Sequence, residues 1–184
     1  MREIGLSERP GHYGIPCKPL PTAGGFWLRE RFDPPPEITG PVVISAGILS
    51  GFEYGAGALD PYAQFRKLTP SAQIDDGVFV FEGRFRIPLA AALAKAENAD
   101  ALLAAGRAEE ALALARSALV LAPESVRPNI VLGDALSALG RTAEARSFYE
   151  TALRLATTIE PDYQGWLAGL IAEKLRPSAP AEAR

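Results

Sequence analysis

Two side chains near the N-terminus, His12 and Cys17, have the chemistry of a base and a nucleophile. A thiol activated by an imidazole can attack a carbonyl carbon when a third group orients the imidazole. Here the pair lies in a stretch rich in proline and glycine, with no sign of an orienting carboxylate or of an oxyanion hole. We therefore expect a histidine in a loop, a small buried thiol and no catalytic residues.

The same two residues limit the metal chemistry of the chain. His12 is the single histidine and Cys17 the single cysteine. A histidine-based metal cluster is therefore excluded, and Cys17 alone cannot complete a structural zinc site or form an internal disulfide. We expect no metal site and no cofactor.

Three other short motifs have the composition of ligand-binding loops. Gly55-Ala56-Gly57 lacks the third glycine of a dinucleotide-binding loop and the lysine-serine pair of a P-loop, so it predicts a turn between a strand and a helix. Asp75-Asp76 offers carboxylates to a cation, but acidic residues at the start of a strand usually form turns. Phe26-Trp27 has aromatic faces that can stack on a sugar, and we expect these rings in a core.

The second half of the chain contains an internal repeat with a spacing of 34 residues. The matched segments are Asp100-Ala101-Leu102 and Asp134-Ala135-Leu136, Gly106-Arg107 and Gly140-Arg141, Glu110-Ala111 and Glu144-Ala145, Ala118-Leu119 and Ala152-Leu153, and Leu121-Ala122 and Leu155-Ala156. Small residues at fixed positions in a repeat of this length are typical of stacked helix-turn-helix units, which bury their apolar faces against one another.

Residues 88–160 resemble the tetratricopeptide repeat. The residues that fit the family's positions are Leu102, Gly106, Ala111, Ala118 and Pro123 in the first unit and Leu132-Gly133, Leu136, Ala145, Tyr149 and Ala152 in the second. The departures are Asn98-Ala99 in place of leucine-glycine, Ala115 in place of an aromatic residue, and a late proline, Pro161. The repeat needs a small residue where the two helices of a unit approach closely, and an aromatic side chain fills the gap between units.

Capping and helix-breaking residues predict five helices in this half. The first expected helix starts at Pro88 and ends at Gly106. The other four run from about Ala108 to Leu121, from Ser125 to about Leu139, from Thr142 to about Thr158, and from Asp162 to about Leu175. The fifth carries an apolar stripe, Trp166, Leu167, Leu170 and Ile171, which is expected to cover the exposed end of the stack.

The first half has a different composition, with most of the glycine, proline and aromatic residues. Strands are expected near 41–49 and 78–82, with a short helix from Pro61 to about Lys67 between them and little regular structure over residues 10–40. The predicted fold class is α+β, in which a small, irregular α/β segment (1–87) precedes an all-α, tetratricopeptide-like solenoid (88–176) of two helix pairs and a capping helix. Residues 177–184 are expected to form a disordered tail.

Residues 11–87 also resemble a known family. The segments HYGIPCKPLP, PVVISAGILSGF, DPYAQFR and DGVFVFEGRF follow one another in this order. The order is similar to the C-terminal soluble segment of polytopic bacterial glycosyltransferases of the dolichyl-phosphate mannosyltransferase type, several of which carry tetratricopeptide repeats after it. The resemblance implies a small extracytoplasmic accessory domain without the membrane-embedded part that holds the family's acidic catalytic residues. It implies no sugar transfer by this chain alone.

Charge and hydropathy exclude two classes of partner. The 184 residues carry a net charge of −3, so the chain lacks the basic surface that binds nucleic acid. The apolar runs are far shorter than the roughly 20 residues needed to span a bilayer, and the N-terminus has no apolar signal core. We expect a cytoplasmic protein if the chain stands alone, and a location on the extracytoplasmic face of a membrane if it is a glycosyltransferase tail.

In tetratricopeptide proteins the first helix of each unit lines a concave groove that receives peptides. The positions that correspond to this groove are Leu93, Ala96, Asp100, Leu103, Arg127, Ile130, Asp134 and Ser137. Only Arg127 suits a clamp for a C-terminal carboxylate, so we expect an apolar peptide with a basic residue opposite Asp100 and Asp134, because unpaired buried carboxylates are costly. Alternatively, the aspartates only cap helices or contact solvent, and the first half of the chain fills the groove.

Two functions follow. The first is a non-catalytic interaction or docking module that binds a protein or peptide partner through its repeats. The second is an accessory domain of a membrane glycosyltransferase that uses lipid-linked sugars, acting in trans or as a detached fragment.

Overall fold

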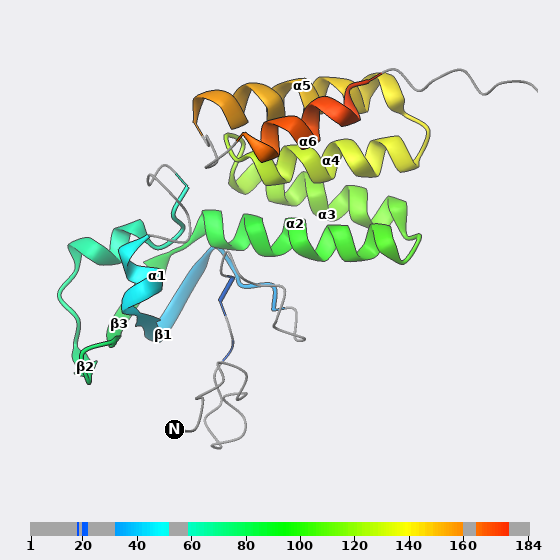
Figure 1. Ribbon diagram of the computed structural model, residues 1–184. Helices are drawn as coiled ribbons and strands as arrows, with labels where there is room; N and C mark the ends of the chain where they lie inside the picture. Colours follow the sequence, from blue (N-terminus) through cyan, green and yellow to red (C-terminus); the bar gives the residue numbers. More distant parts are fainter. Residues whose placement is uncertain (1–17, 19, 22–31, 52–58, 160–164, 177–184) are drawn as a thin grey trace, which may run out of the picture.

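The computed structural model describes residues 18, 20–21, 32–51, 59–159 and 165–176. The candidate nucleophile and base, the Phe26-Trp27 and Gly55-Ala56-Gly57 motifs, Pro161 and the tail 177–184 lie outside the described residues. The elements are β1 (Glu37–Ser45), α1 (Ala46–Ser50), the 3₁₀ helix η4 (Ala63–Lys67), β2 (Ala72–Ile74), β3 (Val78–Arg86), α2 (Pro88–Ala104), α3 (Ala108–Leu121), α4 (Val126–Ala138), α5 (Thr142–Thr158) and α6 (Trp166–Lys174). The chain is α+β, with a small sheet followed by helices (Figure 1).

The sheet is antiparallel and has the strand order β1-β3-β2. β1 pairs with β3 along its whole length, from Glu37 opposite Arg86 to Ser45 opposite Val78. Because side chains alternate along a strand, Val42 is buried whereas Val43 is 61% exposed. The sheet thus has one covered face and one open face.

The first strand differs from the expected range of 41–49 at both ends. It starts earlier, so residues 37–40, expected to be irregular, belong to β1. It ends earlier because the Ser45 side chain accepts a hydrogen bond from the Ile48 N–H (3.3 Å) and caps α1, which Gly51 terminates with a φ of 77°. A serine followed by small and apolar residues fits a helix start as well as a strand, and the strand prediction overlooked the cap.

The remaining elements of the first half also differ in detail. β2 was not predicted, because its three residues are all exposed and lack an alternating pattern. The helix expected from Pro61 is the shorter η4. Asp75-Asp76 lies in the turn between β2 and β3, where Asp75 has a φ of 49°, so the prediction of a turn is confirmed.

A cluster of aromatic rings forms the core on the covered face of the sheet. Phe65 of η4 is fully buried, and its ring centroid lies 5.1 Å from that of Phe81 and 4.8 Å from that of Phe85. Ile87 and Ala90 complete this core. Since Ala90 belongs to α2, the apolar core of the sheet extends into the first long helix.

An ion pair between a buried carboxylate and an exposed guanidinium lies where η4 meets α1. The carboxylate of Asp60 is inaccessible to solvent and pairs with the guanidinium of Arg66. Its Oδ1 also accepts the Tyr62 N–H at 2.8 Å, and Arg66 Nη1 donates to the Leu49 carbonyl at 3.1 Å. Asp60 therefore organises the turn before η4, while Arg66 links that turn to the end of α1.

The five expected helices are present, but the last starts at Trp166, after Gly165 with a φ of 66°, and not at Asp162. Two glycines end the first and the third of them. Gly106 and Gly140 have φ values of 74° and 75°, and the next residue donates its N–H to Leu102 and Leu136, respectively. This left-handed ending satisfies the last carbonyls of α2 and α4. The glycines are one repeat period apart, so the same chemistry ends both helices.

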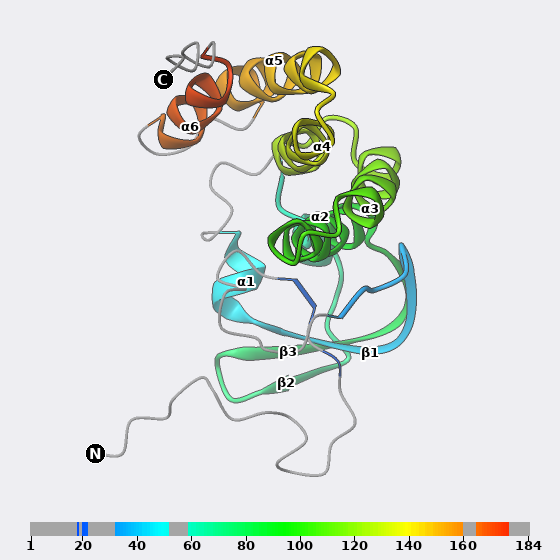
Figure 2. The ribbon, with the colours of Figure 1, turned by 90° about the vertical axis from the view of Figure 1, so that its right-hand side faces the viewer.

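The helices pack in sequence order away from the sheet. α2 contacts α3 and α4, α3 contacts α4, α4 contacts α5, and α5 contacts α6. Figures 1 and 2 show α2 next to the sheet and α5 and α6 farthest from it. In Figure 2, α2, α4 and α6 follow one another on one side, whereas α3 and α5 lie on the other.

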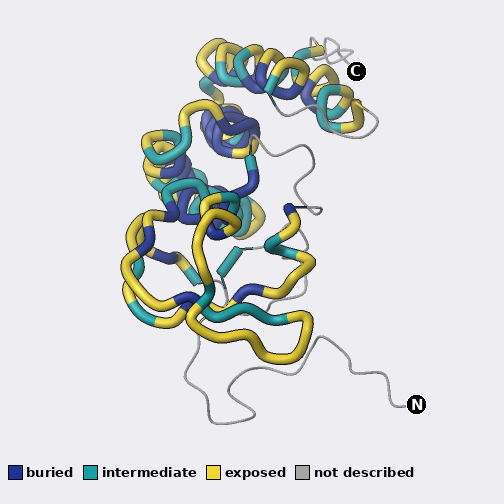
Figure 3. Tube along the Cα trace, turned by 90° about the vertical axis from the view of Figure 1, so that its left-hand side faces the viewer, coloured by how far each residue is buried: buried dark blue, intermediate teal, exposed yellow. Residues whose placement is uncertain are grey.

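α4 is the centre of the helical core. Nine of its 13 residues are buried, and Figure 3 shows the contrast between the buried middle of the helical part and the exposed β2–β3 turn. α6 is covered less completely. Ile171 is fully buried, but Trp166, expected to cover the end of the stack, is 69% exposed. The apolar stripe of α6 therefore covers the core with only part of its width.

Candidate functional site

The residues singled out by the repeat pattern lie on α2 and α4, and α6 adds a further side chain to them. We call the surface that these three helices share the α2–α4–α6 face. Its polar centre consists of Asp100, Arg127, Asp134, Tyr149 and Lys174. Tyr149 reaches this centre from α5.

Two aspartates, one repeat period apart, each pair with a cation of a following helix. Asp100 of α2 pairs with Arg127 at the start of α4. Asp134 of α4 accepts a hydrogen bond from Lys174 Nζ of α6 at 2.6 Å. Each ion pair therefore ties one helix of the face to the next. The basic groups that we expected a peptide to place opposite these carboxylates are supplied by the chain itself.

Asp134 also fixes an aromatic side chain. The Tyr149 hydroxyl donates a hydrogen bond to Asp134 Oδ1 at 2.7 Å, and Lys174 Nζ lies 5.8 Å from the centroid of the Tyr149 ring. The carboxylate thus receives donors from both α5 and α6. Substitution of Asp134 would disturb three helices at once.

Burial shifts the pKa of two groups in the polar centre, Asp100 and Tyr149. The pKa of Asp100 is raised above 3.8, mainly because burial disfavours the carboxylate, with a further contribution from Asp134; Arg127 and Lys174 oppose the increase. The pKa of Tyr149 is also raised, first by burial and then by its hydrogen bond to Asp134. The tyrosine is therefore neutral and acts as a hydrogen-bond donor, not as a base.

The close fit of α4 and α5 explains the leucine-glycine pair of the repeat. A Cβ atom at Gly133 would lie 2.5 Å from Cε1 of the Tyr149 ring, a distance that real side chains do not adopt. At the equivalent positions of the first unit, Ala99 and Ala115 are both fully buried. A large side chain on the second helix of a unit therefore requires glycine at the facing position of the first helix. A small side chain on the second helix leaves room for alanine there.

The structure divides the predicted groove residues by accessibility. Ala96 and Ile130 belong to the helical core, with exposures of 0% and 2%, so they are not available to a ligand. Their positions follow from the helical period, which places them one turn from the surface residues but does not show that neighbouring helices cover them. Leu93, Leu103, Asp100 and Asp134 are half-buried, and Arg127 and Ser137 are exposed.

Lys174 is a residue of this face that the sequence interpretation missed. It follows the apolar stripe of the last helix, where a lysine is typical of the side that faces solvent. The sequence indicates Lys174 only indirectly, because a half-buried carboxylate such as Asp134 requires a nearby cation. Only the packing of α6 shows which cation reaches it.

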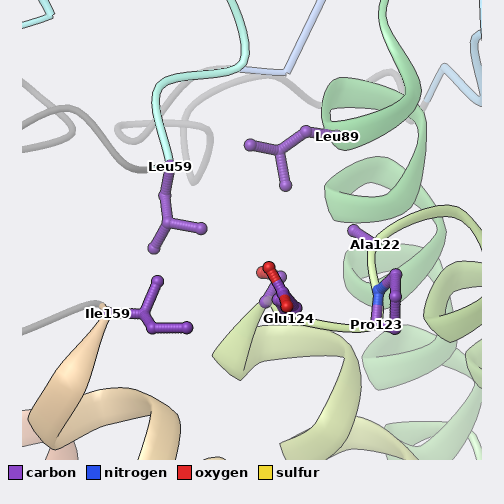
Figure 4. Close-up of a pocket in the computed structure, with 7 residues that line it drawn as sticks. Leu59, Leu89, Ala122, Pro123, Glu124 and Ile159 are labelled. Carbon is purple, nitrogen blue, oxygen red and sulfur yellow. The ribbon is translucent and has the colours of Figure 1, made fainter.

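A separate hollow lies at one edge of the helical part. Its volume is about 290 Å³, and it is lined by Leu59, Leu89, the α3–α4 connection from Ala122 to Ser125, and Ile159. Figure 4 shows the side chains of Leu59, Leu89 and Ile159 directed into the same space. The lining is mostly apolar, with Glu124 as its charged side chain. A site for catalysis would need several polar groups converging on a reacting atom.

Two features are absent from the described residues. Within the described ranges, no group of three or more histidine, cysteine, aspartate or glutamate side chains could hold a metal ion. None of the helices in the same part of the chain combines the length and the apolar composition needed to cross a membrane.

Comparison with protein families identifies one match. Residues 102–170 match the family model of the tetratricopeptide repeat, which supports a repeat segment from the end of α2 into α6. The match starts later than the expected 88–160, and it also ends later because it includes the first half of α6. No curated protein and no solved structure matches the chain. The resemblance of residues 11–87 to glycosyltransferases therefore rests on its sequence motifs alone.

Proposed function

We propose that the chain is a non-catalytic docking module whose α2–α4–α6 face binds a protein or peptide partner. The tetratricopeptide match supports this proposal, because repeats of this family generally mediate protein-protein interactions. In this proposal the helices form a short solenoid of two complete units, followed by α6. The observation that carries the location is the row of accessible side chains on α2 and α4, Leu93, Leu103 and Ser137, beside two ion pairs that balance their own charge.

The charge balance of the face indicates the chemistry of the partner. Two carboxylates face two cations, so the polar centre exerts little net attraction on a strongly charged ligand. Half-buried leucines on α2 offer apolar contact area, which contributes most of the free energy of such docking. We expect a mainly apolar segment without a free carboxylate that must be clamped. The sequence had suggested a partner with a basic residue opposite Asp100 and Asp134, but Arg127 and Lys174 already occupy those places.

Site-specific photo-crosslinking tests the location. A photoreactive amino acid placed at Ser137 should give a defined protein adduct in the native host. The matched control is Val120 on α3, which is 82% exposed and lies away from the face. Adducts of equal yield at both positions would contradict the assignment to the α2–α4–α6 face.

The non-catalytic part of the proposal has its own test. Purified full-length chain should neither hydrolyse nor transfer lipid-linked sugars or acyl substrates. An activity that His12→Ala or Cys17→Ala abolishes would show that the chain is an enzyme.

A further inference from the structure

The cation that pairs with Asp134 does not follow the repeat pattern. In the first ion pair, Arg127 at the start of α4 reaches back to Asp100. The 34-residue period puts Pro161 at the position of Arg127 in the next unit, so this position supplies no cation for Asp134. Asp134 pairs instead with Lys174, near the C-terminal end of α6. The second ion pair is therefore not a copy of the first.

The orientation of α6 also differs from that of α2 and α4. Leu103, Ser137 and Ile171 lie one repeat period apart on α2, α4 and α6. Leu103 is half-buried and Ser137 is exposed, whereas Ile171 is fully buried. α4 packs against both helices of the first unit, whereas α6 packs mainly against α5. α6 therefore turns toward the helical core the side that α2 and α4 leave accessible.

α6 buries fewer residues than any of the four helices before it. One of its nine residues, Ile171, is buried, whereas α5 buries five. Leu167, Ala168 and Leu175 are only partly buried against the core. A helix of this length is also unstable on its own, because few hydrogen bonds offset the cost of forming its first turn. Displacement of α6 thus uncovers less of the core than displacement of another helix.

We propose that α6 is a displaceable cover over Asp134, and that a partner helix takes its place and supplies the cation that Lys174 now supplies. This proposal rests on the proposed function and specifies how the α2–α4–α6 face is regulated. When α6 leaves, Asp134, whose side chain is 24% exposed, loses its cation and favours a new one.

The contacts of α6 define the chemistry of the partner helix. Ile171 is buried in the core, and Lys174, three residues later, donates to Asp134. The two side chains lie on the same side of the helix, because residues three apart are neighbours on its surface. The partner helix is therefore mainly apolar and carries a lysine or arginine three residues after a large aliphatic residue.

A competition between α6 and its partner has a measurable consequence. The apparent affinity of the chain for the partner is reduced to the extent that α6 occupies the site. A change that weakens the attachment of α6 should therefore strengthen binding. A helix with a purely structural role predicts the opposite, because its loss damages the surface to which the partner binds.

A dye-labelled peptide with the sequence of residues 165–176 is the probe, and its fluorescence anisotropy reports binding to the full-length chain. Lys174→Glu in the chain places a second carboxylate beside Asp134, so the dissociation constant should fall at least about tenfold. Arg176→Glu makes the same charge change at an exposed residue and should leave the dissociation constant unchanged. A peptide that itself carries Lys174→Glu should bind the Lys174→Glu chain at least about tenfold more weakly than the native peptide does.

Circular dichroism checks that the variants are folded. If Lys174→Glu does not fold, Lys174→Gln removes the cation without adding a charge and should also strengthen binding. Equal dissociation constants for the native chain and the Lys174 variant would overturn the proposal. Equal binding of the two peptides, or no binding up to about 1 mM, would do the same. Each of these results leaves crosslinking at Ser137 as the separate test of the proposed function, so the inference can fail while that function holds.

Discussion

The size of two side chains determines how closely α4 and α5 approach. Gly133 leaves room for the ring of Tyr149, whose hydroxyl then reaches Asp134. The same tyrosine thus fills a gap in the core and donates a hydrogen bond at the candidate site. At this scale packing and site chemistry depend on each other.

Gly133→Ala should destabilise the protein by about 1–3 kcal/mol, because the new methyl group overlaps with the Tyr149 ring. The matched control is Gly169→Ala in α6, where the added methyl group meets nothing and helix propensity predicts a gain of up to about 1 kcal/mol. Chemical denaturation measures both free energies of unfolding. A Gly133→Ala variant as stable as the native chain would refute the close approach.

The raised pKa of Asp100 predicts the sign of a pH effect. Because the folded pKa lies above 3.8, the stabilisation linked to protonated Asp100 is fully present below pH 3.8 and is lost as the pH rises through the folded pKa. Asp100→Asn should therefore reduce the fall in the free energy of unfolding between pH 3.8 and neutrality. Denaturant titrations across this range measure the slope.

Glu144 provides the control of opposite sign. Its pKa is lowered by a hydrogen bond from Arg141, so its stabilisation is present above pH 4.5 and is lost as the pH falls through the folded pKa. Glu144→Gln should weaken acid destabilisation only slightly, because both side chains are exposed. If Asp100→Asn changed the slope in the same direction as Glu144→Gln, the assigned burial of Asp100 would be incorrect.

At the scale of elements, the second half of the chain could be predicted well and the first half only in part. Pro88, Gly106, Pro123 and Gly140 act through local backbone chemistry, so sequence alone locates the helix ends near them. The β-branched run before Ser45 favours a longer strand, whereas the Ser45 cap starts α1 there. β2 pairs with β3 although its own sequence has no apolar pattern. Such elements depend on contacts distant in sequence.

The candidate site was predictable to a similar extent. The repeat period located Asp100 and Asp134 on one face, because equal positions in equal units share a direction. It could not exclude Ala96 and Ile130, whose burial depends on neighbouring helices. Nor could it find Lys174, which reaches Asp134 from α6, outside the two complete units.

The link between α1 and η4 predicts a large effect of one substitution. Arg66→Met should destabilise the sheet by roughly 3 kcal/mol or more, because the buried Asp60 carboxylate loses its cation. Hydrogen exchange of the β1 and β3 amides reports this loss locally. The control Arg84→Met removes an exposed cation paired with Glu37 and should have little effect. Equal exchange in both variants would argue against the ion pair of the buried Asp60 carboxylate.

At the scale of the whole molecule, the sheet and the helices share a boundary. The one-residue connection, Ile87, is buried in the core of the sheet, and its N–H donates to the Pro36 carbonyl at 2.8 Å. Lys95 of α2 also pairs with Asp33 at 2.7 Å. These contacts indicate that the sheet depends on the first long helix.

A fragment of residues 1–87 should therefore be digested rapidly by protease, whereas the full chain resists cleavage over β1 and β3. The fragment lacks Ala90, and three strands with a small apolar core are marginal in isolation. Limited proteolysis with mass spectrometry compares the two. Equal resistance would show that the sheet folds independently of α2.

The most direct test of the docking function changes an apolar side chain of the α2–α4–α6 face. Leu93 of α2 is half-buried, so Leu93→Lys places a charge where the mainly apolar segment is expected to pack. The matched control, Val120→Lys, makes the same kind of change on α3, where the side chain is 82% exposed. Adduct yield from the crosslinker at Ser137 should fall at least about tenfold in the first variant and stay unchanged in the second. Equal yields in both variants, with both proteins folded, would contradict docking at this face.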